Sequence, residues 1–294
     1  MTDPIPFSLL PDSATNGDDG LYIGGCSVAE LAAEYGTPLF IYDEDHLRAR
    51  AREAVDAFGS GVAYASKAFL CRAMAQLVPE EGMDIDVSTG GEYHVARSAD
   101  VPPENLIFHG NNKSLAELEL AVGNRVSRVI VDSFDELDRL DLLHSRGFPV
   151  PDVLLRITPG VEAHTHEFIA TGRDESKFGF TVSTGLADKA IQRAIASPSV
   201  RVRGIHAHIG SQVFRVDSFA RAAEVIAAVG QPYDLEEVSI GGGLGVPYVL
   251  GEESATITAW ANVVHDALAA AGVTARVTAE PGRVIAAAAA ITVY

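Results

Sequence analysis

Cysteine is scarce in this sequence, since Cys26 and Cys71 are the only two among 294 residues. Two cysteines cannot form a disulfide framework, and neither lies in a CxxC pair of the type that binds metal ions. We therefore expect a protein of the reducing cytoplasm. Residues 1–11 lack a basic segment and include two prolines near their start, so they do not resemble a secretory signal.

Long apolar runs and positive charge are also lacking. The longest apolar stretch, residues 284–294, is far shorter than the roughly 20 residues that span a membrane, so we expect no membrane partner. The 22 Lys and Arg residues stand against 40 Asp and Glu residues, which gives a net charge of −18. This sign opposes a phosphate backbone and predicts no nucleic-acid partner. An anionic ligand must therefore be bound by a local site.

The sequence does contain a regular alternation of short β-branched or aromatic runs with helical patterns. Hydrophobic residues make up 47% and charged residues 21%, which is typical of a globular protein. The alternation predicts βα units on a parallel sheet. The eight predicted strands are residues 62–66, 84–87, 106–109, 129–131, 153–157, 202–208, 237–240 and 275–279. Capping boxes are predicted for the pairs Ser27 and Glu30, Ser114 and Glu117, and Ser133 and Glu136.

Eight such units predict an α/β fold of the (β/α)8 TIM barrel type over residues 38–283, which is the usual size of that fold. The flanks, residues 1–37 and 284–294, contain strand-like runs but are too short to form a domain of their own. We expect residues 1–37 to belong to a second, β-rich domain and residues 284–294 to be its continuation. The remainder of that domain is expected to be absent from this chain.

Polar residues or glycines gather where the predicted strands end. These positions are Lys67, Asp86, His109, Asp132, Arg156, His206, His208, Gly241 to Gly243, Glu280 and Arg283. Enzymes with this type of barrel place their active sites at the C-terminal ends of the strands. The sequence therefore predicts one polar site at this end of the barrel.

The last two strands carry the pattern of a phosphate site. Gly241, Gly242 and Gly243 follow the seventh strand, and backbone without a Cβ atom can approach an anion and present amide groups to it. Arg283 follows the eighth strand, and the loops after strands seven and eight are the usual phosphate site of a barrel. A glycine run alone is better explained as a tight turn, but its position together with Arg283 favours a phosphorylated ligand.

A lysine at the mouth of the barrel adds a second chemical group. The chain has four lysines and 18 arginines, and Lys67 directly follows the first predicted strand. A desolvated lysine can lose its proton and form an imine, whereas an arginine cannot. Lys67 with a phosphate site therefore suggests pyridoxal phosphate bound as a Schiff base. Lys113, after the third strand, could form the Schiff base in the same way. For either residue the alternative is an ordinary solvated surface lysine.

Pyridoxal phosphate makes two further demands. A carboxylate beside the pyridine nitrogen favours the protonated ring, and Glu280 fits this role unless it belongs to a structural ion pair. A flat partner for the ring is offered by His206 or His208, which point the same way because they are two residues apart on one strand. The spacing does not choose between these histidines, and either one could be an ordinary hydrogen-bonded core residue.

A metal site is the competing interpretation. His164 and His166 form one HxH pair, and His206 and His208 form another, as in some barrel hydrolases that bind metals. The first pair lies in a long polar segment after the fifth strand. A metal would also leave the glycine run and Arg283 without a role, so no metal is predicted.

Eight motifs of this chain resemble those of the diaminopimelate decarboxylases. They are residues 64–69 (YASKAF), 86–92 (DVSTGGE), 108–113 (FHGNNK), 162–166 (EAHTH), 176–179 (SKFG), 206–212 (HAHIGSQ), 241–243 (GGG) and 280–283 (EPGR). They occur in the order of the family from end to end of the chain. The wider group is the fold-type III pyridoxal-phosphate decarboxylases, which includes ornithine and arginine decarboxylases. The resemblance implies a TIM barrel of the alanine racemase-like type.

The resemblance also implies roles for individual residues. The implied cofactor-binding residues are Lys67, Asp86, His208, Ser211, Gly242, Gly243, Glu280, Pro281, Gly282 and Arg283. Lys67 would carry pyridoxal 5'-phosphate as a Schiff base and His208 would stack on its ring, so these two are the implied catalytic residues. Ser211 would lie near the phosphate and Glu280 at the pyridinium nitrogen. Arg283 would be shared between the phosphate and the substrate.

The implied activity is the decarboxylation of a small amino acid, meso-diaminopimelate, to L-lysine. Family members continue into a β-domain with a catalytic cysteine that reaches the active site across a dimer interface, and neither Cys26 nor Cys71 lies in the matching context. We therefore expect a homodimer for the full-length protein and an inactive fragment for this chain. The alternatives are an ornithine- or arginine-type decarboxylase and a non-catalytic protein that binds pyridoxal phosphate.

Overall fold

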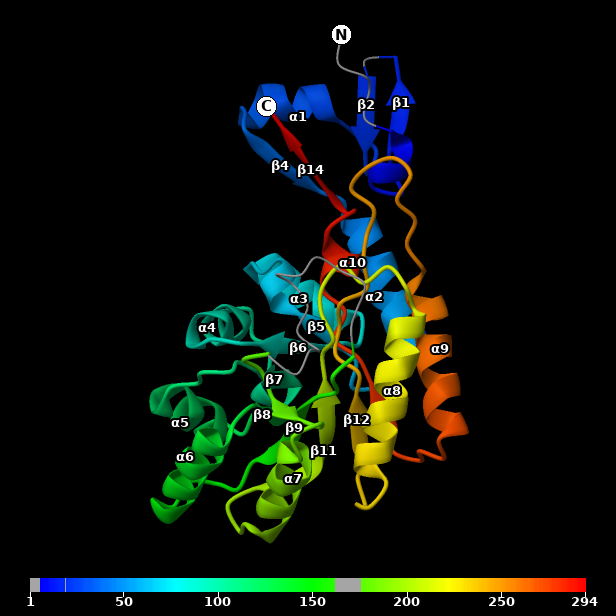
Figure 1. The fold of residues 1–294 in the computed structure, drawn as a ribbon. Helices are drawn as coiled ribbons and strands as arrows, with labels where there is room; N and C mark the ends of the chain where they lie inside the picture. Colours follow the sequence, from blue (N-terminus) through cyan, green and yellow to red (C-terminus); the bar gives the residue numbers. More distant parts are fainter. Residues whose placement is uncertain (1–5, 19, 162–175) are drawn as a thin grey trace.

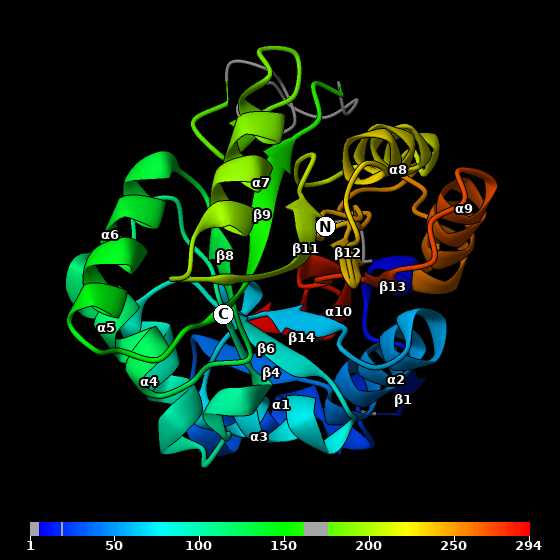
Figure 2. The same cartoon turned by 90° about the horizontal axis from the view of Figure 1, so that it is seen from below.

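Eight parallel strands form a barrel at the centre of the molecule (Figures 1 and 2). The computed structural model describes residues 6–18, 20–161 and 176–294. The barrel strands are β5 (Ala63–Ala65), β6 (Asp84–Val87), β7 (Leu106–Phe108), β8 (Arg128–Val131), β9 (Asp152–Thr158), β11 (Arg201–Ala207), β12 (Glu237–Ser239) and β13 (Arg276–Thr278). The eight predicted strands are confirmed, and each observed end lies within one residue of its prediction. A short strand that was not predicted, β10 (Phe180–Thr181), pairs with β9.

Backbone hydrogen bonds join the first barrel strand to the last. The strands pair in the order β13-β12-β11-β9-β8-β7-β6-β5. The Ala63 N–H donates to the Ala279 carbonyl at 3.0 Å, and the Ala65 N–H donates to the Pro281 carbonyl at 3.1 Å. The barrel is therefore closed, and the segment that follows β13 lies beside the end of β5.

Helices surround the barrel, as the view along its axis shows (Figure 2). They are α2 (Glu44–Phe58), α3 (Arg72–Glu80), α4 (Gly90–Ser98), α5 (Leu115–Gly123), α6 (Phe134–Ser145), α7 (Leu186–Ala196), α8 (Asp217–Gly230) and α9 (Ile257–Ala270). The short α10 (Arg283–Ala286) lies inside this ring, at the mouth of the barrel. Three 3-10 turns are η1 (Phe7–Leu9), η2 (Ser66–Ala68) and η3 (Pro103–Asn105). In the part of the chain that the structure describes, no helix has the length and apolar character needed to cross a membrane.

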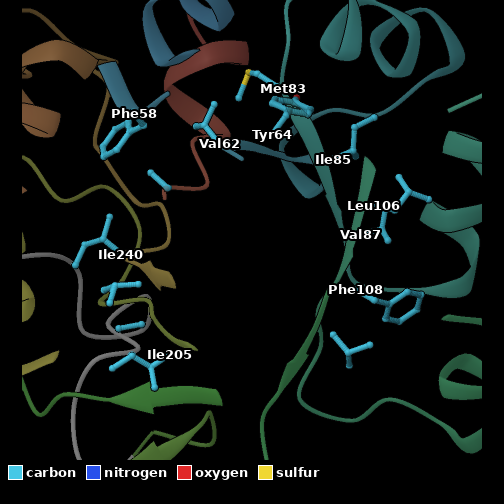
Figure 3. Packing of buried hydrophobic residues seen from close by; sticks show 14 of the residues in the cluster. Phe58, Val62, Tyr64, Met83, Ile85, Val87, Leu106, Phe108, Ile205 and Ile240 are labelled. Carbon is cyan, nitrogen blue, oxygen red and sulfur yellow. The ribbon is translucent and has the colours of Figure 1, made fainter. Parts of the chain in front are cut away.

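The main hydrophobic core lies between the strands and the helices. Tyr64, Ile85 and Phe108 come from three neighbouring strands and are fully buried in this cluster (Figure 3). Because side chains alternate across a strand, the neighbouring residues Ala63 and Ile107 point to the other face, into the barrel. Inside the barrel the apolar cluster is small, which leaves room for polar side chains at the strand ends.

The helix caps confirm the sequence patterns only in part. Ser114 and Glu117 form the full capping box at the start of α5. Ser133 accepts a hydrogen bond from the Glu136 N–H as predicted, but the carboxylate of Glu136 does not return to Ser133. It accepts from the Asp132 N–H instead, at 3.0 Å. The prediction of a reciprocal box at Ser133 was therefore wrong, because the Glu136 carboxylate is recruited by other buried groups.

The flanks of the barrel form two small antiparallel sheets. One contains β1 (Thr15–Gly17), β2 (Gly20–Ile23) and β3 (Cys26–Ser27), and helix α1 (Val28–Tyr35) follows it. In the other, β4 (Leu39–Tyr42) pairs with β14 (Ala290–Val293), so two segments far apart in the sequence lie side by side above the barrel (Figure 1). The assignment of these flanks to a second domain stays a prediction.

The close contact between β11 and β12 predicts that replacing Gly204 strongly destabilises the protein. A Cβ atom on Gly204 would lie 1.8 Å from the Glu237 carbonyl oxygen, so Gly204→Ala must push the two strands apart. We expect the free energy of unfolding to fall by about 3 kcal/mol. In the matched variant Gly123→Ala, at the end of α5, the nearest atom would be Phe148 Cε1 at 3.6 Å. That change should stabilise the protein slightly, by up to about 1 kcal/mol. Urea unfolding measures both, and equal effects would contradict the prediction.

Candidate active site

A cavity of about 500 Å³ lies where the barrel strands end. Nine of the ten residues predicted to bind the cofactor line it, namely Lys67, Asp86, His208, Ser211, Gly242, Gly243, Glu280, Gly282 and Arg283. Pro281 is the exception, because its carbonyl accepts the hydrogen bond from Ala65 that closes the barrel. The fold therefore brings together residues that are spread over most of the sequence.

Lys67 lies in the 3-10 turn η2, directly after β5, and its side chain is exposed at the cavity. Lys113, the other lysine considered from the sequence, is in a different situation. Its side chain is fully buried, and its Nζ atom lies 2.6 Å from a Glu136 carboxylate oxygen. The same atom donates to the carbonyl groups of Gly110 and Ile130. Lys113 thus ties α6 to the loop after β7, and Lys67 is the lysine available to a ligand.

Arg283, Ser211 and Tyr248 form a polar group at another part of the cavity. The Arg283 Nη1 atom donates to the Tyr248 hydroxyl at 2.8 Å, and Nη2 donates to the Ser211 hydroxyl at 3.2 Å. The Nε atom of Arg283 is buried and makes no hydrogen bond within the described part of the chain. A guanidinium group in this state can still bind an anion.

The glycines after β12 are required by the packing of the backbone itself. A Cβ atom on Gly242 would lie 2.2 Å from the Glu280 carbonyl oxygen, and one on Gly243 would lie 2.0 Å from the Gly210 carbonyl oxygen. Gly243 also has a positive φ of 115°, which side chains disfavour. Both glycines nevertheless line the cavity, where their lack of side chains leaves space for a ligand.

Glu280 supplies a carboxylate at the floor of the cavity and is held there by three side chains. Its Oε2 lies 2.9 Å from His206 Nε2, and its Oε1 accepts from the Ser239 hydroxyl at 3.0 Å and lies 3.5 Å from His109 Nε2. Burial alone would raise the pKa of Glu280, but the two histidines outweigh it and hold that pKa well below its usual range. Glu280 is therefore ionised at neutral pH.

Asp86, at the end of β6, also lines the floor of the cavity. Burial raises its pKa to about 6, and the nearby Glu280 charge acts in the same direction. His109 and Lys67 oppose this shift. Asp86 therefore changes its charge closer to neutral pH than an ordinary aspartate does.

The structure distinguishes the two histidines that the sequence left equivalent. His206 is buried and pairs with Glu280, whereas His208 lines the cavity. The Gly242 N–H donates to His208 Nδ1 at 3.2 Å, so the proton of the neutral ring lies on Nε2. Burial, together with the charges of Lys67 and Arg156, holds the pKa of His208 well below its usual value. His208 therefore presents a neutral ring to the cavity.

The metal interpretation depended on two HxH pairs. His164 and His166 lie outside the residues that the structure describes. The second pair is divided, because His208 accepts from the Gly242 N–H, whereas His206 lies with His109 and Glu280, whose polar atoms are all within 4.8 Å of one another. That spacing would also suit a metal ion, so the absence of a metal stays a prediction.

The sequence analysis missed one wall of the cavity. Phe40 and Tyr42 from β4, residues 290–292 from β14, and Tyr248 from the loop after β12 all line it. Tyr42 stacks on Phe69 with ring centroids 4.1 Å apart. Strands β4 and β14 lie at opposite ends of the sequence, so no local pattern predicts that they pair above the barrel.

The donor set of the cavity fits pyridoxal phosphate. It offers an amine at Lys67 for an aldehyde, an ionised carboxylate at Glu280 for a pyridine nitrogen, and a guanidinium at Arg283 with a buried and unbonded Nε for a phosphate. The neutral ring of His208 adds a flat surface to the cavity. The residues therefore match the aldehyde, ring and phosphate of that cofactor.

Comparison with known proteins agrees with the site. Residues 44–287 match the family described as "Pyridoxal-dependent decarboxylase, pyridoxal binding domain". The chain is 44% identical to the diaminopimelate decarboxylase of Mycobacterium tuberculosis (strain ATCC 25618 / H37Rv), over 98% of this chain and 68% of that protein. It is 42% identical to the diaminopimelate decarboxylase of Bacillus subtilis (strain 168), over 87% of this chain and 61% of that protein. The chain thus spans about two thirds of the length of these relatives.

Solved structures show the same fold. Diaminopimelate decarboxylase from M. jannaschii in complex with L-lysine superposes with a TM-score of 0.88 at 29% identity, over 96% of this chain and 69% of that chain. The lysine/ornithine decarboxylase of Vibrio vulnificus with putrescine gives a TM-score of 0.73 at 23% identity, over 90% of this chain and 69% of that chain. The second likeness is one of fold alone.

The different surroundings of the two lysines predict different effects on stability. Lys113→Met leaves the buried Glu136 carboxylate without its cation, so we expect the free energy of unfolding to fall by about 3–5 kcal/mol. Lys67→Met is the matched control, and because its side chain is exposed at the cavity it should change that free energy by less than about 0.5 kcal/mol. Urea denaturation of the cofactor-free protein measures both. A larger loss for Lys67→Met would show that the two roles are reversed.

The raised pKa of Asp86 predicts that the free energy of unfolding of the native protein, relative to that of Asp86→Asn, depends on pH. The pKa of Asp86 is raised to about 6 in the folded state from 3.8, so the folded state keeps its proton while the unfolded state loses it. The native protein therefore loses stability relative to Asp86→Asn as the pH rises from 4 to 6, by about 3 kcal/mol in total. Above pH 6 the difference should stay constant. Urea midpoints at pH 4, 5, 6 and 7 test this, and a difference that shrinks with rising pH would refute it.

Proposed function

This chain belongs to the diaminopimelate decarboxylase family of pyridoxal-dependent decarboxylases, and we propose that it is the cofactor-binding barrel of an enzyme that converts meso-diaminopimelate to L-lysine and carbon dioxide. One observation carries the proposal: an amine, an ionised carboxylate and a guanidinium meet in a single cavity. The amine follows β5, and the carboxylate and the guanidinium follow β13, the strand beside it in the closed barrel.

The anion-binding end of the cavity is the group around Arg283. Its guanidinium would bind the phosphate, and the hydroxyl groups of Ser211 and Tyr248 hold two of its nitrogen atoms in place. Because the whole protein is acidic, with a net charge of −18, the anion must be bound by such a local positive group. Gly242 and Gly243 allow the ligand to approach the backbone closely.

The floor of the cavity would hold the pyridine ring. When bound, pyridoxal phosphate supplies a protonated ring that withdraws electrons from the carbon atom that loses carbon dioxide. The ionised carboxylate of Glu280 favours that protonated form, and His206 and Ser239 fix the orientation of the carboxylate. The neutral His208 offers its ring as a flat partner without adding a positive charge.

Lys67 is the amine that would hold the cofactor through its aldehyde. A lysine on a turn that is packed against β5 can reach into the cavity while its backbone stays fixed. Residues of β4 and β14 form part of the cavity wall beside it.

The substrate assignment is supported by the relatives. The M. jannaschii structure is described as a complex with L-lysine, which is the product expected here. Ornithine- and arginine-type decarboxylases share the cofactor chemistry, but the likeness to the V. vulnificus enzyme is too distant to favour that activity.

The proposal extends to the organisation of the whole protein. It includes a homodimer of the full-length protein and a second, β-rich domain to which residues 1–37 and 284–294 belong, supported by the pairing of β4 with β14. It also includes a cytoplasmic location, supported by the free thiols of Cys26 and Cys71. The inactivity of this chain on its own stays a prediction.

Cofactor binding gives the first test. We expect the protein to develop the absorption band of an imine when pyridoxal phosphate is added, and Lys67→Ala to remove that band. Arg283→Met should weaken binding by about 10- to 100-fold, the size expected for hydrogen bonds to a charged group. Arg215→Met is the matched control, since Arg215 is an exposed residue that pairs with Asp217 on the surface. Loss of the band in Lys113→Ala but not in Lys67→Ala would contradict the assignment.

Turnover gives the second test. Release of carbon dioxide and lysine should be measured with meso-diaminopimelate, ornithine and arginine in competition, both for this chain and for the product of the complete reading frame. The proposal expects release from meso-diaminopimelate by the complete product. Preference for ornithine or arginine would favour the polyamine type of decarboxylase. Cofactor binding without release of carbon dioxide from any of the three amino acids would favour a non-catalytic protein that binds pyridoxal phosphate.

A further inference from the structure

A buried histidine that the proposed mechanism does not use, His109, stands between the two carboxylates of the cavity floor. It follows β7, and 6% of its surface is exposed. Its Nε2 atom lies 3.5 Å from Oε1 of Glu280 and 3.8 Å from Oδ1 of Asp86. Asp86 and Glu280 line the cavity, whereas His109 lies behind them. Any effect of His109 on a ligand therefore passes through the carboxylates.

We propose that His109 is a positioning residue, which carries a proton at neutral pH and thereby keeps both Asp86 and Glu280 ionised at the floor of the cavity. The proposal rests on the proposed function in one respect, namely that Glu280 faces the ring of the cofactor. The charge state of His109 itself is a property of the protein without any ligand.

The geometry requires a cation at this place. Two buried carboxylates that both lie within 4 Å of one histidine nitrogen repel each other, and one of them takes up a proton unless a positive charge lies between them. His109 Nε2 is within ion-pairing distance of both. The ring of His206 meets that of His109 edge to face, with centroids 5.2 Å apart, which fixes the orientation of the imidazole.

The pKa shifts agree with this geometry. Burial alone would lower the pKa of His109, but the charges of Asp86 and Glu280 outweigh burial and raise it above its usual value. Burial lowers the pKa of His206, which is therefore the neutral partner of Glu280. The pKa of Asp86 is raised to about 6, so Asp86 is still ionised at neutral pH.

Other charged groups face this cluster from the neighbouring elements. Arg156 on β9 lowers the pKa of His109, but Arg156 is itself paired with Asp132 at 3.3 Å. Lys67 and Glu92 act on Asp86 in opposite directions. They therefore leave the pairing of His109 with its two carboxylates as the main interaction.

The cluster carries a net negative charge that a positively charged ligand can neutralise. At neutral pH the cluster contains two carboxylates, the protonated His109 and the neutral His206, which together carry one negative charge. A ligand that brings one positive charge to the cavity floor, such as a protonated ring nitrogen, makes the site neutral. His109 thus limits the site to a single unmatched negative charge.

Histidine NMR on the cofactor-free protein tests the proton directly. The chain contains nine histidines, and the signal of His109 is identified by its absence in His109→Gln. We expect the His109 imidazole to be still protonated at pH 7.5. Its titration midpoint should fall by about one unit or more in Asp86→Asn and in Glu280→Gln, because each change removes a nearby negative charge. A His109 that is neutral at pH 7.5, or a midpoint that neither variant moves, would overturn the proposal.

A double-mutant cycle tests the charge balance. At pH 7.5 His109→Gln should lower the urea midpoint, and Asp86→Asn should raise that midpoint more in the His109→Gln background than in the native protein. At pH 5 this excess should shrink, since Asp86 is then protonated in both backgrounds. His94→Gln, an exposed position on α4, is the matched control and should have little effect. An equal effect of Asp86→Asn in both backgrounds at both pH values would show that His109 acts by packing alone.

These measurements are independent of the catalytic activity. If His109→Gln does not fold, the His109 signal is assigned by correlation of its imidazole with the backbone, and the NMR titrations of Asp86→Asn and Glu280→Gln still decide the charge state. If the protein never binds pyridoxal phosphate, the proposed function fails while the titration of His109 can still be observed. If the cofactor binds normally but His109 is neutral, only the role given to His109 fails.

Discussion

The closure of the barrel is the constraint on which the rest of the structure depends. Two backbone hydrogen bonds join β5 to the segment after β13, and one of them ends on the carbonyl of Pro281. This contact sets Lys67, which follows the first barrel strand, beside the turn that contains Glu280 and Arg283. A sheet left open at this seam would hold the same residues at opposite edges. The amine and the two groups that complement it are therefore neighbours because the first and last strands are neighbours.

A closed barrel with a polar end must balance every charge that it buries. At the opposite end of the strands, Glu237 lies 2.9 Å from Arg128 and 2.5 Å from Arg276. Near the cavity, Lys113 satisfies Glu136. In these pairs the charge of each carboxylate is neutralised by a neighbouring cation. Removing one partner would leave a costly buried charge. The cavity floor differs because two carboxylates share one histidine, which leaves a charge for a ligand. Structural and functional charges in this barrel are thus both buried. They differ in whether neighbouring opposite charges neutralise them fully.

The sequence predicted the barrel because local patterns determine its strands, and those patterns together with the family resemblance predicted nine of the residues that line the cavity. Short apolar runs mark the strands, and Ser114 with Glu117 marks a helix start, since both depend on neighbouring residues only. The reciprocal cap at Ser133 failed because Glu136 responds to Lys113, a residue from another βα unit. The choice between His206 and His208 needed the position of Glu280 on a different strand. What the sequence could not provide was in each case a contact between distant segments, as in the cavity wall formed by β4 and β14.

The glycine run after β12 has a structural role that its interpretation as a phosphate site did not include. The run was interpreted as a phosphate site, yet Gly242 and Gly243 are required even without a ligand, because a Cβ atom on either would collide with backbone. Glycine at these two positions is therefore required by the close packing of the strand ends. The stronger indication of an anion is Arg283, whose Nε is buried and makes no hydrogen bond to the residues described by the structure. A buried guanidinium nitrogen that makes no hydrogen bond costs free energy. Arg283 therefore points to a bound anion more directly than the glycine run does.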